Sequence, residues 1–370
     1  MNPQSYVTSE ELSGGVCLVQ RGRALPVVVD AADQAGVRRA VADFVLDLER
    51  VSGVRPAVLT AAPQAAPQAL IIGTLGQSPL IDHLVAHARV DLETLPGSWE
   101  RWLRLTVESP LPGVERALVI IGSDRRGTMY GVYDLCEQIG VSPWYWWADV
   151  PVARRASLFV SPERFLSRSP EVKYRGIFLN DEAPALSAWA RDTFGGMNRR
   201  FYSRVFELLL RLKANTLWPA MWGNAFNEDD AENPRLADEY GIVMGTSHHE
   251  PMLRAQKEWH AHGQGPWDYA TNGERLRKFW SDGIARNKEF ESIVTLGMRG
   301  DGDMPMSEED NVALLERIVQ DQRSILADHF GGAPEQVPQV WALYKEVQSY
   351  YDKGMRVPDD VTLLYCDDNW

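Results

Sequence analysis

The sequence predicts an α/β protein in two parts, and three observations lead to that prediction. Residues from 15 to 165 alternate strand-like and helix-like patterns, which is typical of a compact α/β domain. From residue 174 onward, apolar strand-like segments alternate with stretches long enough for helices, an order that favours a parallel sheet. Those later segments end in acids, amides, histidines or tryptophans. We therefore expect an N-terminal α/β domain over residues 1–168 and a second domain over residues 169–370.

The elements of the first domain follow from local apolar patterns. An amphipathic stretch at residues 37–51 predicts a helix. The apolar runs that predict strands are 25–29, 69–72, 102–107 and 117–121. Residues 60–68, rich in Pro, Ala and Gln, are expected to form a loop, and residues 151–170 the linker to the second domain.

A glycine-containing segment at residues 121–131 follows a strand and leads into a helix. A helix N-terminus attracts phosphate groups, so a nucleotide-dependent enzyme is one alternative. The glycine spacing fits neither the dinucleotide-binding fingerprint nor the Walker loop. Met129, Val132 and Leu135 instead have the spacing of a helix-packing stripe. We therefore expect this segment to be structural.

The second domain contains six strand-like segments, and a parallel barrel is the preferred prediction for it. The segments are 174–182, 215–222, 241–250, 292–303, 338–346 and 361–370. Apolar positions at helical spacing in 200–213 and 311–330 predict intervening helices. A (β/α)8 TIM-type barrel typically needs about 250 residues, and residues 174–370 supply only roughly 200. We expect a barrel that is truncated after about six strands.

Composition excludes some classes of function. A formal net charge of −13 and a pI near 5.1 argue against nucleic acid as a partner, because that binding depends on Lys and Arg. No apolar run approaches the roughly 18 residues of a membrane span, and no signal peptide is visible. As written, the chain is expected in the cytoplasm, or secreted or periplasmic if its N-terminus is incomplete. Three distant cysteines support neither disulfides nor a thiolate metal site.

Carboxylates recur at the ends of the later strand-like segments. They are Asp181, Glu182, Asp301, Asp303, Glu346, Asp367 and Asp368. In a parallel barrel the C-terminal ends of the strands share one pocket, so their joint placement indicates an enzyme. Cleavage of a glycosidic bond usually takes two carboxyl groups. Because neighbouring residues of a strand point to opposite faces, we expect only one of each adjacent pair to face the barrel's centre.

Two clusters resemble metal sites, but neither has the full spacing of one. His248 and His249 are adjacent, and neighbours in a strand diverge, so we expect one of them to donate a hydrogen bond to substrate. The segment 301–303 resembles the start of a calcium loop, yet Met304 and Pro305 follow where oxygen ligands are required. We therefore predict neither a metal nor a cofactor.

Arg299 and two tryptophans are further candidates for the pocket. Arg299 either binds an acid group of the substrate or balances Asp301 or Asp303, since a guanidinium makes bidentate contacts with carboxylates. Trp222 is placed where an indole could stack on a sugar ring. Trp218 could serve in the same way or fill the core.

The strand-end segments resemble family 115 of the glycoside hydrolases, the xylan α-1,2-glucuronidases. The matching residues are 143–149, 174–182, 215–222, 297–303, 344–346 and 363–370. The resemblance implies removal of glucuronic acid, or its 4-O-methyl ether, from glucuronoxylan with inversion. It also implies that members continue beyond the Asp-Asp-Asn-Trp segment with the rest of the barrel and form homodimers.

Residue roles carry over by position. Glu346 matches the proposed general acid, while Asp303, Asp367 and Asp181 match the other essential acids, among which the base lies. The residues matched to the substrate pocket are Asn180, Trp222, His248 or His249, and Arg299, and Asp368 is a further candidate. The predicted partner is glucuronoxylan or an aldouronic acid oligosaccharide. The alternatives are an inactive, truncated carbohydrate-binding fragment of the same family and a retaining, hexuronidase-like hydrolase.

Overall fold

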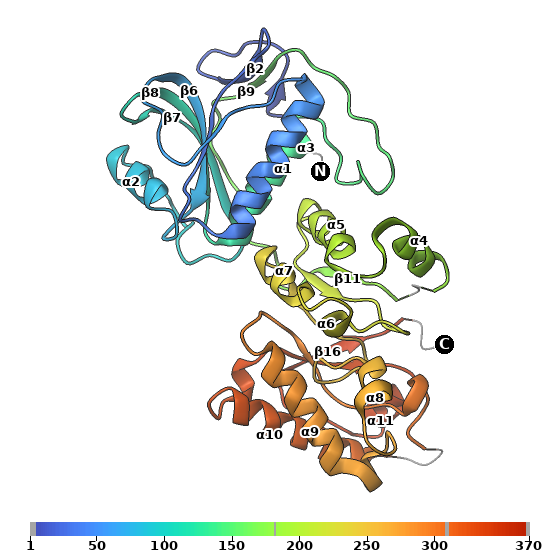
Figure 1. The fold of residues 1–370 in the computed structure, drawn as a ribbon. Coiled ribbons are helices and arrows are strands. Elements are labelled where there is room, and N and C mark those ends of the chain that lie inside the picture. Colours follow the sequence, from blue (N-terminus) through green and yellow to red (C-terminus); the bar gives the residue numbers. More distant parts are fainter. Residues whose placement is uncertain (1–4, 181–182, 308–310, 368–370) are drawn as a thin grey trace. The chain divides into compact units, whose positions relative to one another are not determined.

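The computed structural model describes residues 5–180, 183–307 and 311–367, which cluster into two compact units (Figure 1). Unit 1 contains Met1–Tyr174 together with Glu207–Asn215 and Glu239–Gly241. Unit 2 contains Arg175–Phe206, Thr216–Asp238 and Ile242–Trp370. Short later segments thus return to unit 1, and the division at residues 168 and 169 stays a prediction.

The described part of unit 1 contains two sheets. The larger has the strand order β10-β7-β8-β6-β4-β5, with β6, β8, β4 and β5 parallel and β7 and β10 antiparallel to their neighbours. Its strands are β4 Val27–Val29, β5 Val58–Leu59, β6 Ala66–Thr74, β7 Trp102–Leu111, β8 Val114–Gly122 and β10 Phe165–Leu166. The smaller sheet is antiparallel and contains β1 Val7–Thr8, β9 Leu158–Val160, β2 Val16–Gln20 and β3 Arg23–Ala24.

Three helices cover the larger sheet. They are α1 Ala35–Ser52, α2 Pro79–His87 and α3 Arg125–Gln138. Helices α1 and α3 pack against each other, and α2 lies against β6 and β7 (Figure 1). The four predicted strands and the predicted helix of this domain are confirmed. The predicted loop at 60–68 is wrong at its end, because β6 already begins at Ala66 and pairs there with Val114.

At the glycine-containing segment before α3, the place where a phosphate would bind is taken by a side chain of the protein. One Asp124 oxygen accepts a hydrogen bond from the Gly127 amide at 2.8 Å, and the other accepts one from the Glu100 amide at 2.7 Å. A carboxylate therefore already occupies the positive end of the helix. A Cβ atom at Gly122 would lie 2.1 Å from Thr128 Oγ1, so this glycine allows close packing of strand and helix. These contacts support a structural role.

The described residues of unit 2 form six parallel strands that are neighbours in chain order. One sheet pairs β11 Gly176–Phe178, β12 Thr216–Trp218 and β13 Val243–Met244. The other pairs β14 Val294–Thr295, β15 Gln339–Leu343 and β16 Val361–Tyr365. A parallel bridge between Met244 and Ser292 links β13 to the start of β14. All six predicted strand segments are confirmed, although each strand is shorter than its segment.

Helices connect these strands, as expected for parallel strands that need crossovers. The α-helices are α4 Ala185–Phe194, α5 Arg199–Arg211, α6 Phe226–Asp229, α7 Asn233–Glu239, α8 Gln256–His262, α9 Tyr269–Asn287, α10 Val312–His329 and α11 Glu346–Asp352. Two 3-10 turns, η1 Asp301–Asp303 and η2 Pro334–Gln336, complete the unit. Both predicted helices are present as α5 and α10.

The core of unit 2 lies where α9 and α10 pack against β14 and β15. Trp280 and Trp341 are fully buried in this cluster, beside Leu315, Ile318 and Leu326. Tryptophans of this unit therefore serve partly as core residues. Among the described residues, none of the helices is both long and apolar enough to cross a bilayer.

Candidate active site

The predicted site residues follow the C-terminal ends of successive parallel strands. Asn180 follows β11, Trp222 follows β12, and the two histidines follow β13. Arg299 and Asp303 come after β14, Glu346 after β15 and Asp367 after β16. Parallel pairing brings these strand ends to one edge. Five of the residues are in direct contact there and are called the strand-end cluster: His248, His249, Arg299, Asp303 and Glu346.

Arg299 lies at the centre of this cluster. Its side chain is only 4% exposed, and Nε and Nη2 donate to the two oxygens of Glu346 at 2.9 and 2.7 Å. Nη1 donates to the carboxylate and the backbone carbonyl of Asp303. Burial would lower the pKa of Arg299, but the contacts with Glu346 and Asp303 outweigh it and raise that pKa. Arg299 therefore carries a fixed positive charge between two carboxylates.

Asp303 is held from two sides. His248 Nε2 lies 2.9 Å from Asp303 Oδ1, and Arg299 pairs with the same oxygen. Burial alone would raise the pKa of Asp303, but the hydrogen bond from His248 and the charge of Arg299 lower it below 3.8. Asp303 is therefore ionised at neutral pH.

The two histidines do not diverge as expected, since both lie close to Asp303. That one of them donates a hydrogen bond to substrate stays a prediction. Residues 248 and 249 lie in a turn after β13, where the alternation of a strand does not apply. His248 Nε2 and His249 Nδ1 lie 2.9 and 3.8 Å from Asp303 Oδ1. Burial lowers the pKa of His249 to about 4, despite the opposing charge of Asp303. His249 is thus a neutral imidazole.

Aromatic rings flank the cluster. Trp222 is 46% exposed and stacks on His249, with ring centroids 5.0 Å apart and an interplanar angle of 28°. Tyr344 packs against His248 at 4.3 Å, and the Arg299 guanidinium lies 5.2 Å from its ring centroid. Trp222 thus offers an open indole face, whereas Trp218 packs edge-on against Phe178.

Tyr344 is a site residue that the sequence reasoning did not single out. It follows the end of β15 and stands two residues before Glu346. Its position directly after a buried strand, in a segment that resembles the family, could have indicated that Tyr344 belongs to the site. Between the two, Lys345 has a φ of +52°, a strained conformation that places Glu346 at the first turn of α11.

Three of these residues have ligand atoms close enough to hold a metal ion. The atoms of His248, His249 and Asp303 lie within 4.8 Å of one another. Arg299 pairs with the same Asp303 oxygen, and its positive charge opposes a cation there. The chemistry of this set therefore fits hydrogen bonding to an anionic or hydroxylated ligand better than metal binding.

Other predicted residues are not brought into the cluster. Asn180 and Asp367 are exposed, and no described hydrogen bond joins either of them to Arg299, Asp303 or Glu346. Asp181 and Asp368 lie outside the described residues. Asp301 accepts hydrogen bonds from Gln256 and His260 instead of pairing with Arg299.

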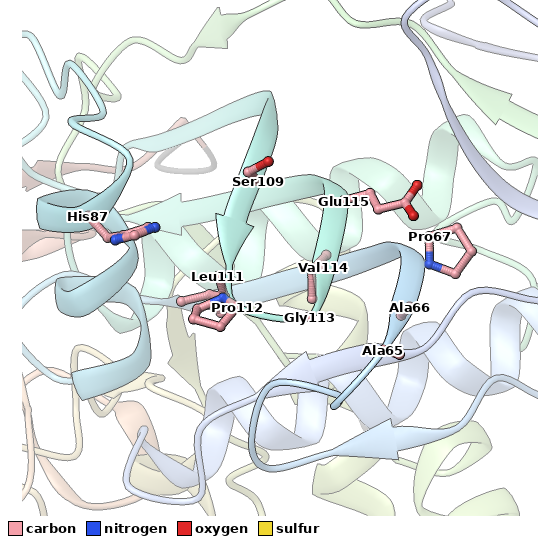
Figure 2. Close-up of a pocket in the computed structure, with 10 residues that line it drawn as sticks. All are labelled: Ala65, Ala66, Pro67, His87, Ser109, Leu111, Pro112, Gly113, Val114 and Glu115. Atoms are coloured by element: carbon pink, nitrogen blue, oxygen red, sulfur yellow. The ribbon is translucent and has the colours of Figure 1, made fainter.

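A depression in unit 1 has a different character (Figure 2). It lies beside the β7–β8 turn at Pro112 and Gly113 and is lined mainly by small and apolar side chains. His87 and Glu115 lie at opposite ends of it, so its polar groups do not converge on one point (Figure 2). The depression lacks the grouped charged side chains of the strand-end cluster.

Comparison with known proteins shows first the fold and then the family. Solved glycoside hydrolases resemble the chain, among them a β-N-acetylhexosaminidase from Streptomyces coelicolor A3(2), with 12% identity over 95% of this chain and 66% of that one at a TM-score of 0.51. A mutant β-hexosaminidase from Streptomyces plicatus has 13% identity over 95% and 71% at a TM-score of 0.52. At such identities the likeness shows the fold alone.

The chain belongs to glycosyl hydrolase family 115, whose model matches residues 167–370. BtGH115A, a family 115 4-O-methyl-α-glucuronidase described as specific for decorated arabinogalactans, has 37% identity and a TM-score of 0.85. The match covers 95% of this chain and 46% of that one, so this chain spans about half of the relative's length. Among curated proteins, none matches the chain significantly. The predicted family is confirmed.

Proposed function

We propose that this chain carries the acid-binding part of a glycoside hydrolase site that releases glucuronic acid or its 4-O-methyl ether from a polysaccharide. The observation that carries the proposal is the buried guanidinium of Arg299 between Asp303 and Glu346. Family membership and the 4-O-methyl-α-glucuronidase activity named for BtGH115A support it. We further propose that β11 to β16 are six strands of a (β/α)8 barrel, since they are parallel and neighbours in chain order.

In this proposal the substrate's own carboxylate competes for Arg299. The guanidinium now binds both Glu346 oxygens, so neither oxygen is free to approach a glycosidic oxygen. A uronic acid group that took over part of the guanidinium would release Glu346 to hold a proton. Arg299 would then select the sugar acid and free the general acid in one step.

The bond is broken by two carboxyl groups acting together. Glu346 gives its proton to the leaving glycosidic oxygen while a water molecule attacks the anomeric carbon and loses its proton to the base. The base is one of Asp303, Asp367 and Asp181, and the lowered pKa of Asp303 keeps it ionised for such a role. Attack by water from the opposite face inverts the anomeric configuration.

Two polysaccharides are candidate substrates. The resemblance of the strand-end segments points to glucuronoxylan, with aldouronic acids as its oligosaccharides. The arabinogalactan specificity named for BtGH115A makes a decorated arabinogalactan the second candidate.

The test is release of 4-O-methylglucuronic acid from each polysaccharide by this chain and by its Glu346→Gln variant. Release by the wild type alone supports the proposal, and NMR of fresh product that shows the β-anomer supports inversion. Release of the α-anomer would instead indicate a retaining hydrolase. Binding of an aldouronic acid without release, by a folded protein, would identify the chain as a carbohydrate-binding fragment.

A further inference from the structure

Helix α8 holds the turn that carries Asp303. Gln256, the first residue of α8, donates from Nε2 to Asp301 Oδ1 at 2.6 Å, and His260 Nε2 lies 2.9 Å from the same oxygen. The backbone N–H of Gln256 also donates to Glu250 Oε1 at 3.0 Å. Gln256 is only 5% exposed. It therefore joins the segment that follows His249 to the turn between Arg299 and Asp303.

The turn needs such support because its backbone is strained. Asp303 has a φ of +62°, in the left-handed region that a residue with a side chain rarely adopts, and Gly302 precedes it at +65°. The turn is closed by the Gly300 amide, which donates to the Met304 carbonyl at 2.7 Å. Trp267 Nε1 donates to the Arg299 carbonyl at 2.9 Å. Gln256 is a buried side chain that contacts this turn at Asp301.

We propose that Gln256 is a positioning residue, which acts through Asp301 to hold the Asp303 carboxylate against Arg299 and His248. Gln256 itself makes no described hydrogen bond to any of those three side chains. Asp301 thus serves as a hydrogen-bond acceptor and not as a catalytic carboxylate. The expected effect on kcat rests on the proposed function, whereas the expected effect on the stability of the turn does not.

Neighbouring residues of α8 supply matched controls. Lys257, whose side chain is 43% exposed, pairs with Asp229 at 2.6 Å, and no described hydrogen bond or ion pair joins it to the turn. Lys257→Ala is therefore expected to leave turnover unchanged. His260, whose side chain is 56% exposed, shares Asp301 with Gln256, and His260→Ala is expected to have the smaller effect because water can replace it.

The first measurement is amide hydrogen exchange in the peptide that covers residues 299–304. It needs no substrate. Gln256→Ala is expected to speed exchange there relative to wild type and Lys257→Ala. Without the contact to Asp301 the turn opens more often, and the hydrogen bond from the Gly300 amide to the Met304 carbonyl breaks more often. Unchanged exchange in a folded Gln256→Ala protein would overturn the proposal even if the chain proved inactive.

The second measurement is a double-mutant cycle on turnover. Gln256→Ala and Asp301→Ala are each expected to lower kcat about tenfold, the scale of one buried hydrogen bond, with KM within about twofold. The double variant is expected to match either single one, because both remove the same contact. Asp301→Asn keeps an acceptor oxygen and is expected to retain kcat. Additive losses, or an inactive Asp301→Asn, would contradict the proposal.

Discussion

Arg299 binds both carboxylate oxygens of Glu346, with Nε and Nη2 at 2.9 and 2.7 Å. The pair joins the end of β14 to the first turn of α11, and Asp303 shares the remaining side of the guanidinium. A planar fork of donors suits a carboxylate better than a point charge does. The geometry that now holds Glu346 is therefore also suited to a uronic acid.

We expect Arg299→Lys to lower kcat/KM for glucuronoside hydrolysis at least about 100-fold, because an ammonium group cannot make the bidentate contact. Wild type should prefer the free uronic acid to its methyl ester, and the variant should lose most of that preference. Initial rates on the two substrates measure both effects.

Arg323→Lys is the matched control for this prediction. Arg323 also binds both oxygens of a carboxylate, Asp360, at 2.7 and 3.2 Å, outside the site. Its replacement should leave kcat/KM within about twofold, as for a partly exposed ion pair. An equal loss from both variants would mean that Arg299 acts only on stability.

Trp222 is expected to contribute to substrate binding more than to stability. Its indole is 46% exposed and stacks on His249, so truncation opens little of the core. We expect Trp222→Ala to raise KM about tenfold through loss of sugar stacking, with Tm within about 2 °C. Steady-state kinetics and thermal unfolding measure the two.

Trp144→Ala is the control, because it makes the same substitution at a tryptophan of similar exposure. Trp144 is 45% exposed and belongs to unit 1, whereas all residues of the strand-end cluster belong to unit 2. Neither KM nor kcat should change in this variant. A KM effect of similar size from both tryptophans would argue against a specific stacking role for Trp222.

The strand-end cluster was predictable from sequence because parallel strands bring their C-terminal ends together. Apolar runs locate the strands, and the polar residues that follow them include Arg299, Asp303 and Glu346. Side-chain direction was less predictable. The prediction that His248 and His249 diverge assumed that the strand continued, whereas the strand ends at Met244.

The residues that sequence reasoning missed act through contacts between distant segments. Gln256 meets Asp301 across 45 positions, and Tyr344 meets His248 across almost 100. No local pattern reports such a contact, because glutamine and tyrosine are ordinary residues at the start of a helix and after a strand. Only the fold shows that Gln256 contacts the turn that carries Asp303 and that Tyr344 packs on His248, which is hydrogen-bonded to Asp303.

His249 is expected to make the protein acid-sensitive. Burial lowers its pKa to about 4 from an ordinary 6.5, so the folded protein leaves His249 neutral where the unfolded chain protonates it. Its contribution to stability is thus complete above pH 6.5 and is lost as the pH falls toward 4. Between pH 7 and 4.5 we expect wild type to lose about 2 kcal/mol more unfolding free energy than His249→Gln, which cannot titrate.

Urea unfolding at the two pH values measures this difference. His83→Gln is the control, because it makes the same substitution at an exposed histidine on α2. Equal losses in wild type and His249→Gln would show that other groups account for the acid sensitivity.

Asp43 is expected to have the opposite pH dependence in unit 1. Burial, aided by the charge of Glu207, raises its pKa to about 7, while its oxygen accepts a 2.6 Å hydrogen bond from Tyr133. The folded protein therefore keeps Asp43 protonated where the unfolded chain ionises it. The stability from this group is complete below pH 3.8 and is lost as the pH rises through 7.

Asp43→Asn removes this titration and keeps an oxygen that can accept from Tyr133. Between pH 5 and 8 we expect wild type to lose about 2 kcal/mol more unfolding free energy than the variant, since only wild type must ionise a buried carboxyl. Glu49→Gln on the same helix is the control, because Glu49 pairs with Arg55 at the surface. Urea unfolding at both pH values measures the effect, and parallel losses in Asp43→Asn and wild type would mean that Asp43 does not titrate in this range.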